Sequence, residues 1–353
     1  MNTATVTKST QSKLLTWRLA QTRPALAFLI LAFAWSWLFW LGGIALRGRD
    51  DLLLMTTVFV GGYGPAVAGI LTLGLRNGLR LFDMNRKSVV TMLLSAALIF
   101  GLMTARYLVG PVSGYEGLPA NLTLSAPILL MAIAASLIGG KMIASAFSSN
   151  VDIREKISSI LPTRKSLGWV LFSLVFFPVL VLISWGLAAL LGMGVEYPGL
   201  WGRPFLEVLP LALLSFALTA LARGGNEEPG WRGALQPILQ NKCSPLVASL
   251  IVSVFWSLWH LPLYLNGFYG EPLLMGMIGG GIYRLFLAVF LTWVYNRSGG
   301  NVLAMIILHA TFNMVVNFLP TSDLLLLVLW IIVTVFAVLK DKMYRKPEQA
   351  RSS

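Results

Sequence analysis

The chain has 353 residues, of which 57% are hydrophobic and only 12% are charged. Its mean hydropathy of +0.77 excludes a soluble globular domain and indicates an integral membrane protein. The net charge of +13 does not point to nucleic acid as a partner, because the basic residues lie between apolar segments rather than in one patch. The single cysteine, Cys243, excludes an intrachain disulfide framework and a cysteine-based zinc site.

Apolar runs of about 17–25 residues predict membrane-spanning helices. Ten such runs follow one another along the chain: Pro24–Leu46, Leu52–Leu75, Ser88–Val109, Leu124–Phe147, Gly168–Leu191, Phe205–Ala222, Pro245–Leu265, Leu273–Asn296, Val302–Phe318 and Leu324–Leu339. We therefore predict an all-α fold, a polytopic bundle of about ten transmembrane helices. No internal repeat is visible, so residues 24–339 form one domain between a basic leader (1–23) and a basic tail (340–353).

The loops predict the orientation in the bilayer, because Lys and Arg concentrate on the cytoplasmic side. Every second loop is basic, starting with the leader and ending with the tail. The alternate loops carry Glu116, Glu196, Glu271 and Asp323. We expect both termini to be cytoplasmic in a multi-pass protein of the cell membrane, with Glu227–Arg232 toward the cytoplasmic face.

Glycines gather in the second and eighth predicted helices. The second contains Gly61, Gly62, Gly64 and Gly69, and the eighth has the spacing Gly276-xxx-Gly280. Small residues let helices approach one another closely, and this is the role that we expect. A broken or re-entrant segment at Gly279–Gly281 is the alternative.

Two adjacent carboxylates lie between long apolar runs, in the stretch Gly225–Arg232. Asn226 is a good N-cap, and Pro229 is tolerated in the first turn of the helix that follows. Glu228 and Arg232 are four residues apart, in the favourable order for an ion pair on one helix face. Glu228 would thus be neutralised by its own helix, which leaves Glu227 free for chemistry.

The two histidines of the chain, His260 and His309, both lie within apolar helices, and Asn313 shares a helix face with His309. One such residue alone would suggest a hydrogen bond between helices. Together with the Glu pair they suggest a site. A carboxylate and a histidine can activate water while the second histidine and the asparagine stabilise an oxyanion. Zinc held by His260, His309 and Glu227 is the alternative cofactor arrangement, and the residues leave both open.

Two further features bear on this site. Arg284, near the middle of its predicted helix, is expected to pair with Glu227, to hold a substrate carboxylate, or to bond backbone carbonyls. Helix rise places His309 about 10 Å from the cytoplasmic end of its segment but His260 about 20 Å from its own. Either an interfacial helix around Trp231–Gln240 lowers the start of the seventh helix, or the site is deep.

The order Glu-Glu-xxx-Arg, aromatic-xxx-His and His-xxx-Asn resembles the CPBP family of intramembrane proteases. That family contains the type II CAAX prenyl endopeptidases and bacterial proteins linked to bacteriocin immunity. The motifs lie in a core of about residues 205–318. By resemblance, Glu227 assisted by His260 is the base, and His309 and Asn313 form the oxyanion pocket. The resemblance also implies that Glu228 and Arg232 orient the site. Trp256 departs from the usual phenylalanine of the second motif and is a candidate substrate contact.

The resemblance implies an intramembrane endopeptidase, either glutamate-dependent or a metalloprotease. Its partners would be the lipid bilayer and a membrane-embedded or lipidated peptide or protein, with no nucleic acid. A proton-coupled secondary transporter is the alternative from another class, since Glu, His and Arg can also form a relay. A catalytically idle immunity or scaffold protein of the same fold is the third interpretation.

Overall fold

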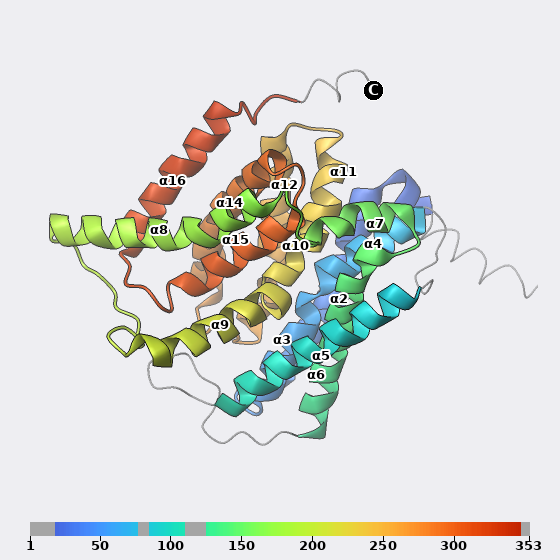
Figure 1. Ribbon diagram of the computed structural model, residues 1–353, viewed down its shortest axis with the longest axis horizontal. Helices are drawn as coiled ribbons and strands as arrows, with labels where there is room; N and C mark the ends of the chain where they lie inside the picture. Colours follow the sequence, from blue (N-terminus) through green and yellow to red (C-terminus); the bar gives the residue numbers. More distant parts are fainter. Residues whose placement is uncertain (1–17, 77–84, 110–124, 347–353) are drawn as a thin grey trace, which may run out of the picture.

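The structure is a computed structural model that describes residues 18–76, 85–109 and 125–346. The first part of the basic leader, the loop with Glu116 and the end of the basic tail lie outside the described residues. Within them the regular secondary structure is helical, with turns and loops between the helices and one isolated bridge between Glu196 and Thr321. The predicted all-α bundle is therefore confirmed (Figure 1).

The helices follow the predicted runs with shifts of a few residues. They are α2 (Pro24–Gly42), α3 (Asp51–Gly62), α4 (Gly64–Arg76), α5 (Arg86–Val109), α6 (Ala126–Ala144), α7 (Val151–Ile157), α8 (Leu167–Leu191), α9 (Phe205–Ala222), α10 (Glu228–Gly230), α11 (Gln236–Gln240), α12 (Pro245–Trp259), α13 (Leu261–Leu265), α14 (Leu273–Arg297), α15 (Val302–Val315) and α16 (Asp323–Lys340).

Nine helical segments within the described residues are long and apolar enough to cross a membrane. The exception among the ten predicted runs is α15, which has 14 residues and is about 21 Å long. Its N-terminus is capped by Asn301, whose side chain accepts from the backbone N–H of Ala304. The helix packs between α8 and α9. The short α15 carries His309 and Asn313, so both residues belong to a helix that is enclosed by its neighbours.

The glycines of the second predicted span allow close helix packing, as predicted. A Cβ at Gly61 would lie 2.2 Å from the Trp40 indole, and one at Gly230 would lie 2.1 Å from the backbone of Pro65. This span is divided into α3 and α4 at Tyr63, next to Pro65. α10 can therefore rest directly on α4.

The eighth predicted span is one continuous helix, α14, so the alternative of a re-entrant segment at Gly279–Gly281 is wrong. Gly276 and Gly280 instead make room for one aromatic side chain. A Cβ at Gly276 would lie 2.3 Å from the Tyr264 ring, and a Cβ at Gly280 would lie 2.5 Å from its hydroxyl. The close approach is thus between α14 and the side chain of Tyr264 in α13.

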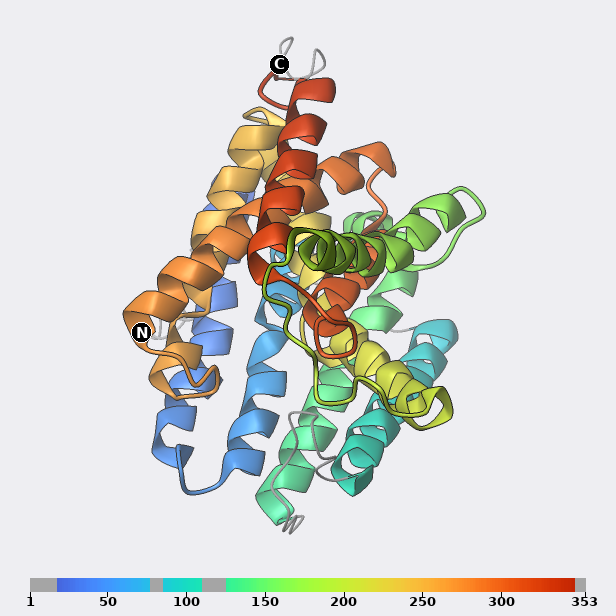
Figure 2. The same cartoon turned by 90° about the vertical axis from the view of Figure 1, so that its left-hand side faces the viewer.

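The helices are far from parallel. α8 runs across the molecule in Figure 1 and is seen end-on in Figure 2, where α2, α3 and α16 stand nearly upright. The turn between α11 and α12 and the C-terminal end of α16 lie at the top of both views, whereas the turn between α2 and α3 lies at the bottom. α10 lies in the interior, against α4 and α15. The carboxylate pair is therefore held at the centre of the bundle.

Candidate functional site

The carboxylate pair lies within a 36-residue helical segment, Phe205–Gln240, that changes its winding repeatedly. A 3₁₀ turn over Gly225–Glu227 leads into α10, and a π-helical turn over Trp231–Leu235 leads into α11. Irregular helix inside a membrane is tolerated where it is enclosed by protein, and residues 224–236 are all buried. The alternative of an interfacial helix around Trp231–Gln240 does not fit this arrangement, since the first half of that segment is part of the bundle core.

Asn226 does not cap a helix as predicted. It lies inside the 3₁₀ turn, where its side-chain oxygen accepts a 2.9 Å hydrogen bond from the backbone N–H of Gly224. The capping prediction failed because the helix already starts one residue earlier, at Gly225, in 3₁₀ form. Pro229 occupies the first turn of α10, as predicted.

Gly224 turns the chain from α9 into the site. Its φ of 138° is a conformation that side chains with a Cβ rarely adopt. A Cβ there would also lie 2.6 Å from Nδ2 of Asn313 and 3.0 Å from Nε2 of His309. The position therefore requires glycine both for its backbone and for the space that it leaves beside His309 and Asn313.

Glu227 and Glu228 face different surroundings, as their spacing to Arg232 predicts. Glu228 is completely buried and lies 3.3 Å from the Arg232 guanidinium, which is also completely buried. Oε1 of Glu228 is also 2.7 Å from Nδ1 of His309 on α15. Glu227 makes neither contact and lines the cavity. Glu228 thus contacts a guanidinium and an imidazole on neighbouring elements, whereas the Glu227 side chain faces the cavity.

Trp256 connects the parts of the site. Its indole Nε1 donates a 2.7 Å hydrogen bond to Oε2 of Glu227. Its ring centroid is 6.0 Å from that of His260 and 5.3 Å from that of His309, and the Arg232 guanidinium lies 4.8 Å from it. An indole can both pack and donate, whereas a phenylalanine at this position could only pack.

His260 lies at the point where α12 ends and α13 begins, just before Pro262. Its Nδ1 is 2.7 Å from the carbonyl oxygen of Trp256. A carbonyl oxygen only accepts, so Nδ1 carries the proton and Nε2 of the neutral ring is left as an acceptor. The break in the helix thus presents a histidine of defined tautomer to the cavity.

Asn313 lies one helical turn beyond His309, on the exposed side of α15. Its Nδ2 donates a 3.3 Å hydrogen bond to the carbonyl oxygen of Arg223, at the end of α9. This long bond uses one of the two amide protons and orients the side chain. The other proton remains for a ligand.

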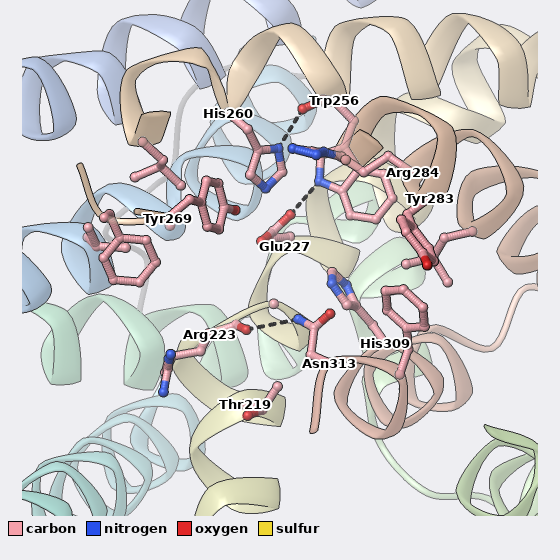
Figure 3. A pocket seen from close by; sticks show the side chains of 18 of the residues that line it. Thr219, Arg223, Glu227, Trp256, His260, Tyr269, Tyr283, Arg284, His309 and Asn313 are labelled. Atoms are coloured by element: carbon pink, nitrogen blue, oxygen red, sulfur yellow. Dashed lines mark hydrogen bonds between the residues drawn. The ribbon is translucent and has the colours of Figure 1, made fainter. Parts of the chain in front are cut away.

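One cavity of about 500 Å³ brings most of the predicted residues together. Glu227 lies between Trp256 and His260 on one side and His309 and Asn313 on the other (Figure 3). The predicted residues that line it are Glu227, Trp256, His260, Arg284, His309 and Asn313, whereas Glu228 and Arg232 lie behind its wall. Sequence reasoning missed Arg223, Gly224, Tyr264, Tyr269 and Glu271, which also line it. Tyr264 could have been found from its spacing, because residues four apart share a helix face and Tyr264 lies four residues after His260.

The depth of the cavity resolves the mismatch in the predicted positions of the histidines. α11 and α12 are joined by a tight turn, and Glu228 and His260 lie about 18 Å and 22 Å from that turn along their helices. α15 starts beside Gly233, since Val302 is 3.5 Å from the Cβ position of that glycine, and Gly233 is already about 10 Å below the turn. The site therefore lies deep in the bundle, about 20 Å from the turn between α11 and α12. α12 begins at this turn, whereas α15 begins about 10 Å below it.

A zinc ion held by Glu227, His260 and His309 would need all three side chains to converge on one point. Within the described ranges, no group of three or more His, Cys, Asp or Glu side chains is placed to do so. Nδ1 of each histidine is engaged, one with a carbonyl and one with Glu228, so only the two Nε2 atoms could face a metal. Because the three side chains do not converge, they do not fit a three-ligand zinc site.

Comparison with known proteins bears directly on this cavity. A family model described as type II CAAX prenyl endopeptidase Rce1-like matches residues 209–315, from α9 to the end of α15. The resemblance is confirmed. The CAAX prenyl protease 2 of Methanococcus maripaludis is 32% identical over 116 residues, which are 31% of this chain and 40% of that protein. The chain thus matches less than half of the length of this relative, and the matched family segment contains every predicted site residue.

Proposed function

We propose that this protein is an intramembrane endopeptidase that hydrolyses a peptide bond with a water activated by Glu227 and His260. The observation that carries the proposal is the common cavity, in which a carboxylate and an imidazole acceptor face a second pair, His309 and Asn313, able to donate. The similarity to the CAAX prenyl endopeptidase family over the same segment supports it.

The reaction would begin with a water between Glu227 and Nε2 of His260. The water oxygen attacks the peptide carbonyl carbon while one of its protons passes to the Glu227 carboxylate, and the carbonyl oxygen becomes an oxyanion. When the tetrahedral adduct collapses, the C–N bond breaks and the proton is transferred to the leaving amine. The second water proton also passes to the amine, so the products are a carboxylate and an ammonium group, and Glu227 is again ionised.

The oxyanion would be held by His309 and Asn313. In the proposed mechanism His309 acts with both ring nitrogens protonated. Nδ1–H donates to Glu228, 2.7 Å away, and Nε2–H donates to the oxyanion. The second amide proton of Asn313 would add another donor.

The substrate would be a membrane-associated peptide or protein, and in particular the C-terminus of a lipidated chain. The protein is a multi-pass membrane protein, and the cavity is lined by apolar and aromatic residues beside the reactive groups. The name of the similar Methanococcus maripaludis protein points to prenylated chains. A proton-coupled carrier has less support, since no repeat of interrupted helices is visible.

The decisive experiment uses the purified protein in lipid nanodiscs and a farnesylated CAAX-type peptide with a fluorophore and a quencher on either side of the expected cleavage site. Cleavage, with the cut located by mass spectrometry, is expected for the wild type and absent for Glu227→Gln. Glu271→Gln, which changes an exposed carboxylate at the same cavity, is the matched control and should cleave normally. Equal cleavage by wild type and Glu227→Gln would contradict the proposal. No cleavage by folded wild type would favour the idle immunity or scaffold protein.

Both termini are proposed to be cytoplasmic, in the cell membrane. Single cysteines in a Cys243→Ala background test this with an impermeant maleimide on intact cells. Positions near Glu196 and Asp323 should react, whereas those near Arg154 and Lys342 should react only after the cells are opened. The reverse pattern would place the basic loops outside.

A further inference from the structure

Arg284 is a buried cation in the cavity that no motif explains. Its side chain is 8% exposed and its hydrogen bonds within the described part of the chain go to the hydroxyl of Tyr264, at 2.9 Å from Nη2 and 3.5 Å from Nη1. The Nε atom has no hydrogen-bond partner among the residues that the structure describes. Of the alternatives expected from the sequence, neither an ion pair with Glu227 nor bonds to backbone carbonyls is present among the described residues.

The guanidinium is nevertheless held in a defined place. The Tyr264 hydroxyl that accepts from Arg284 donates its own proton to the carbonyl oxygen of Gly276, at 2.8 Å, so the tyrosine is fixed between α13 and α14. Gly280 provides the space, since a Cβ there would lie 2.5 Å from Nη1 of Arg284. A guanidinium has five N–H donors, and one neutral hydroxyl cannot satisfy them. The site is thus built around a cation with unused donors.

No carboxylate within the described residues forms an ion pair with Arg284. Glu228 contacts Arg232 and His309, and Glu227 accepts a hydrogen bond from the Trp256 indole. Glu271, the other carboxylate that lines the cavity, is exposed and lies outside ion-pairing distance of Arg284. An intramembrane arginine without a carboxylate partner is costly unless a ligand supplies the anion.

We propose that Arg284 binds the C-terminal carboxylate of the peptide that enters the cavity, so that the enzyme selects chains with a free C-terminus close to the cleaved bond. The inference rests on the proposed function, because the ligand is its peptide substrate. An arginine fork pairs with a carboxylate through two parallel hydrogen bonds. Arg284 would thus be a substrate-positioning residue, with Tyr264 holding its guanidinium.

The depth of Arg284 favours a peptide over a lipid headgroup as the source of the anion. It lies about 17 Å from the start of α14 and about 20 Å from its end, close to the middle of the span. Headgroups lie at the membrane surface, about 15 Å from the centre of the hydrocarbon core. A peptide carried into the cavity beside Glu227 reaches this depth, whereas a headgroup has to leave the interface.

The test measures binding, so it does not depend on turnover. Two fluorescent farnesylated peptides of one sequence, one with a free C-terminal carboxylate and one with a C-terminal carboxamide, are titrated with Glu227→Gln protein in neutral nanodiscs. The free acid should bind roughly 10- to 100-fold more tightly, as for a hydrogen-bonded charge pair. Adding Arg284→Gln should bring the two affinities together by weakening the acid alone. Tyr264→Phe should reduce the preference, and Arg284→Lys should keep part of it.

Controls separate this role from others. Lys340→Gln, which removes an exposed cation outside the cavity, and Arg223→Gln, which removes the exposed cation that lines it, should both keep the preference. Equal binding of the two peptides before Arg284 is changed would overturn the proposal, and so would a preference that follows Arg223. An Arg284-dependent preference that disappears in anionic nanodiscs would identify a lipid headgroup as the occupant and would overturn it too.

The result is separable from that of the proposed function. If the wild type cleaves neither peptide while the Arg284-dependent preference persists, the carboxylate site stands and the proteolytic proposal fails. If the wild type cleaves both peptides with equal kcat/KM and Arg284→Gln lowers both alike, the proteolytic proposal stands and Arg284 has only a structural role.

Discussion

The indole nitrogen of Trp256 donates a 2.7 Å hydrogen bond to a carboxylate oxygen of Glu227, although the two residues lie on different helical elements. This bond fixes one oxygen of the proposed base and leaves the other toward the cavity. It also gives a function to Trp256, which stands where the family that this chain resembles usually has a phenylalanine.

Trp256→Phe removes this donor and keeps an aromatic ring. Hydrogen bonds to charged groups contribute about 1.5–3 kcal/mol, so we expect kcat to fall roughly 10- to 100-fold. Trp259→Phe is the matched control, because Trp259 is equally buried on the same helix and its indole N–H has no hydrogen-bond partner in the described part of the chain. Similar losses of kcat in both variants would show that ring volume, not the hydrogen bond, is responsible.

Glu227→Gln and Glu228→Gln should have different effects on stability. Glu228 joins Arg232 and His309, and removing one partner of a buried ion pair costs about 3–5 kcal/mol, so Glu228→Gln should unfold at a clearly lower temperature. Glu227 has no ion pair in the described chain, and Glu227→Gln should melt near the wild type while losing activity. Thermal unfolding in detergent and peptide cleavage measure the two properties. A stable Glu228→Gln protein would contradict the ion-pair account.

His309 and Asn313 should act together on the transition state. Loss of one oxyanion donor typically lowers kcat by about 100- to 1,000-fold, or ~3–4 kcal/mol, with little change in KM. We expect this for Asn313→Ala, with an unchanged melting temperature because the side chain is exposed. The His309→Ala, Asn313→Ala double variant should lose much less than the product of the two factors. A residue that merely joins helices would cost roughly 0.6 kcal/mol of stability and leave kcat intact.

Gly224→Ala should impair activity through the geometry of the turn. The added Cβ meets Asn313 and His309, and a strained backbone conformation costs about 1–3 kcal/mol. We expect kcat to fall at least 10-fold. Gly192→Ala is the control for strain alone, since Gly192 also has a positive φ, of 66°, but has no atom near its Cβ position. Equal activity of the two variants would show that Gly224 does not shape the site.

Activity should depend little on zinc, since Glu227 and His260 activate water in the proposed mechanism. Treatment with a chelator that removes zinc is expected to leave most of the peptide cleavage. Metal analysis of the active protein is the second measurement. Stoichiometric zinc that disappears in both His260→Ala and His309→Ala, together with loss of activity on chelation, would favour the metalloprotease alternative.

The sequence by itself determined the helices and the local geometry of the carboxylate pair. In a membrane every backbone polar group must be satisfied, so long apolar runs predict helices with small errors at their ends. The Glu228–Arg232 contact also followed from sequence, because a spacing of four on a helix places two side chains side by side whatever surrounds them. The sequence also reveals which polar and charged residues make up the site, because they stand out in an otherwise apolar chain.

Only the tertiary structure decided how these residues meet. The bonds from Trp256 to Glu227, from His309 to Glu228 and from Arg284 to Tyr264 each join different elements. Lipid and helix interior are equally apolar, so hydropathy does not reveal which face of a helix packs against which. Small residues such as Gly230 and Gly280 allow helices and side chains to approach closely. Which neighbour fills the space beside each glycine is decided by the tertiary structure.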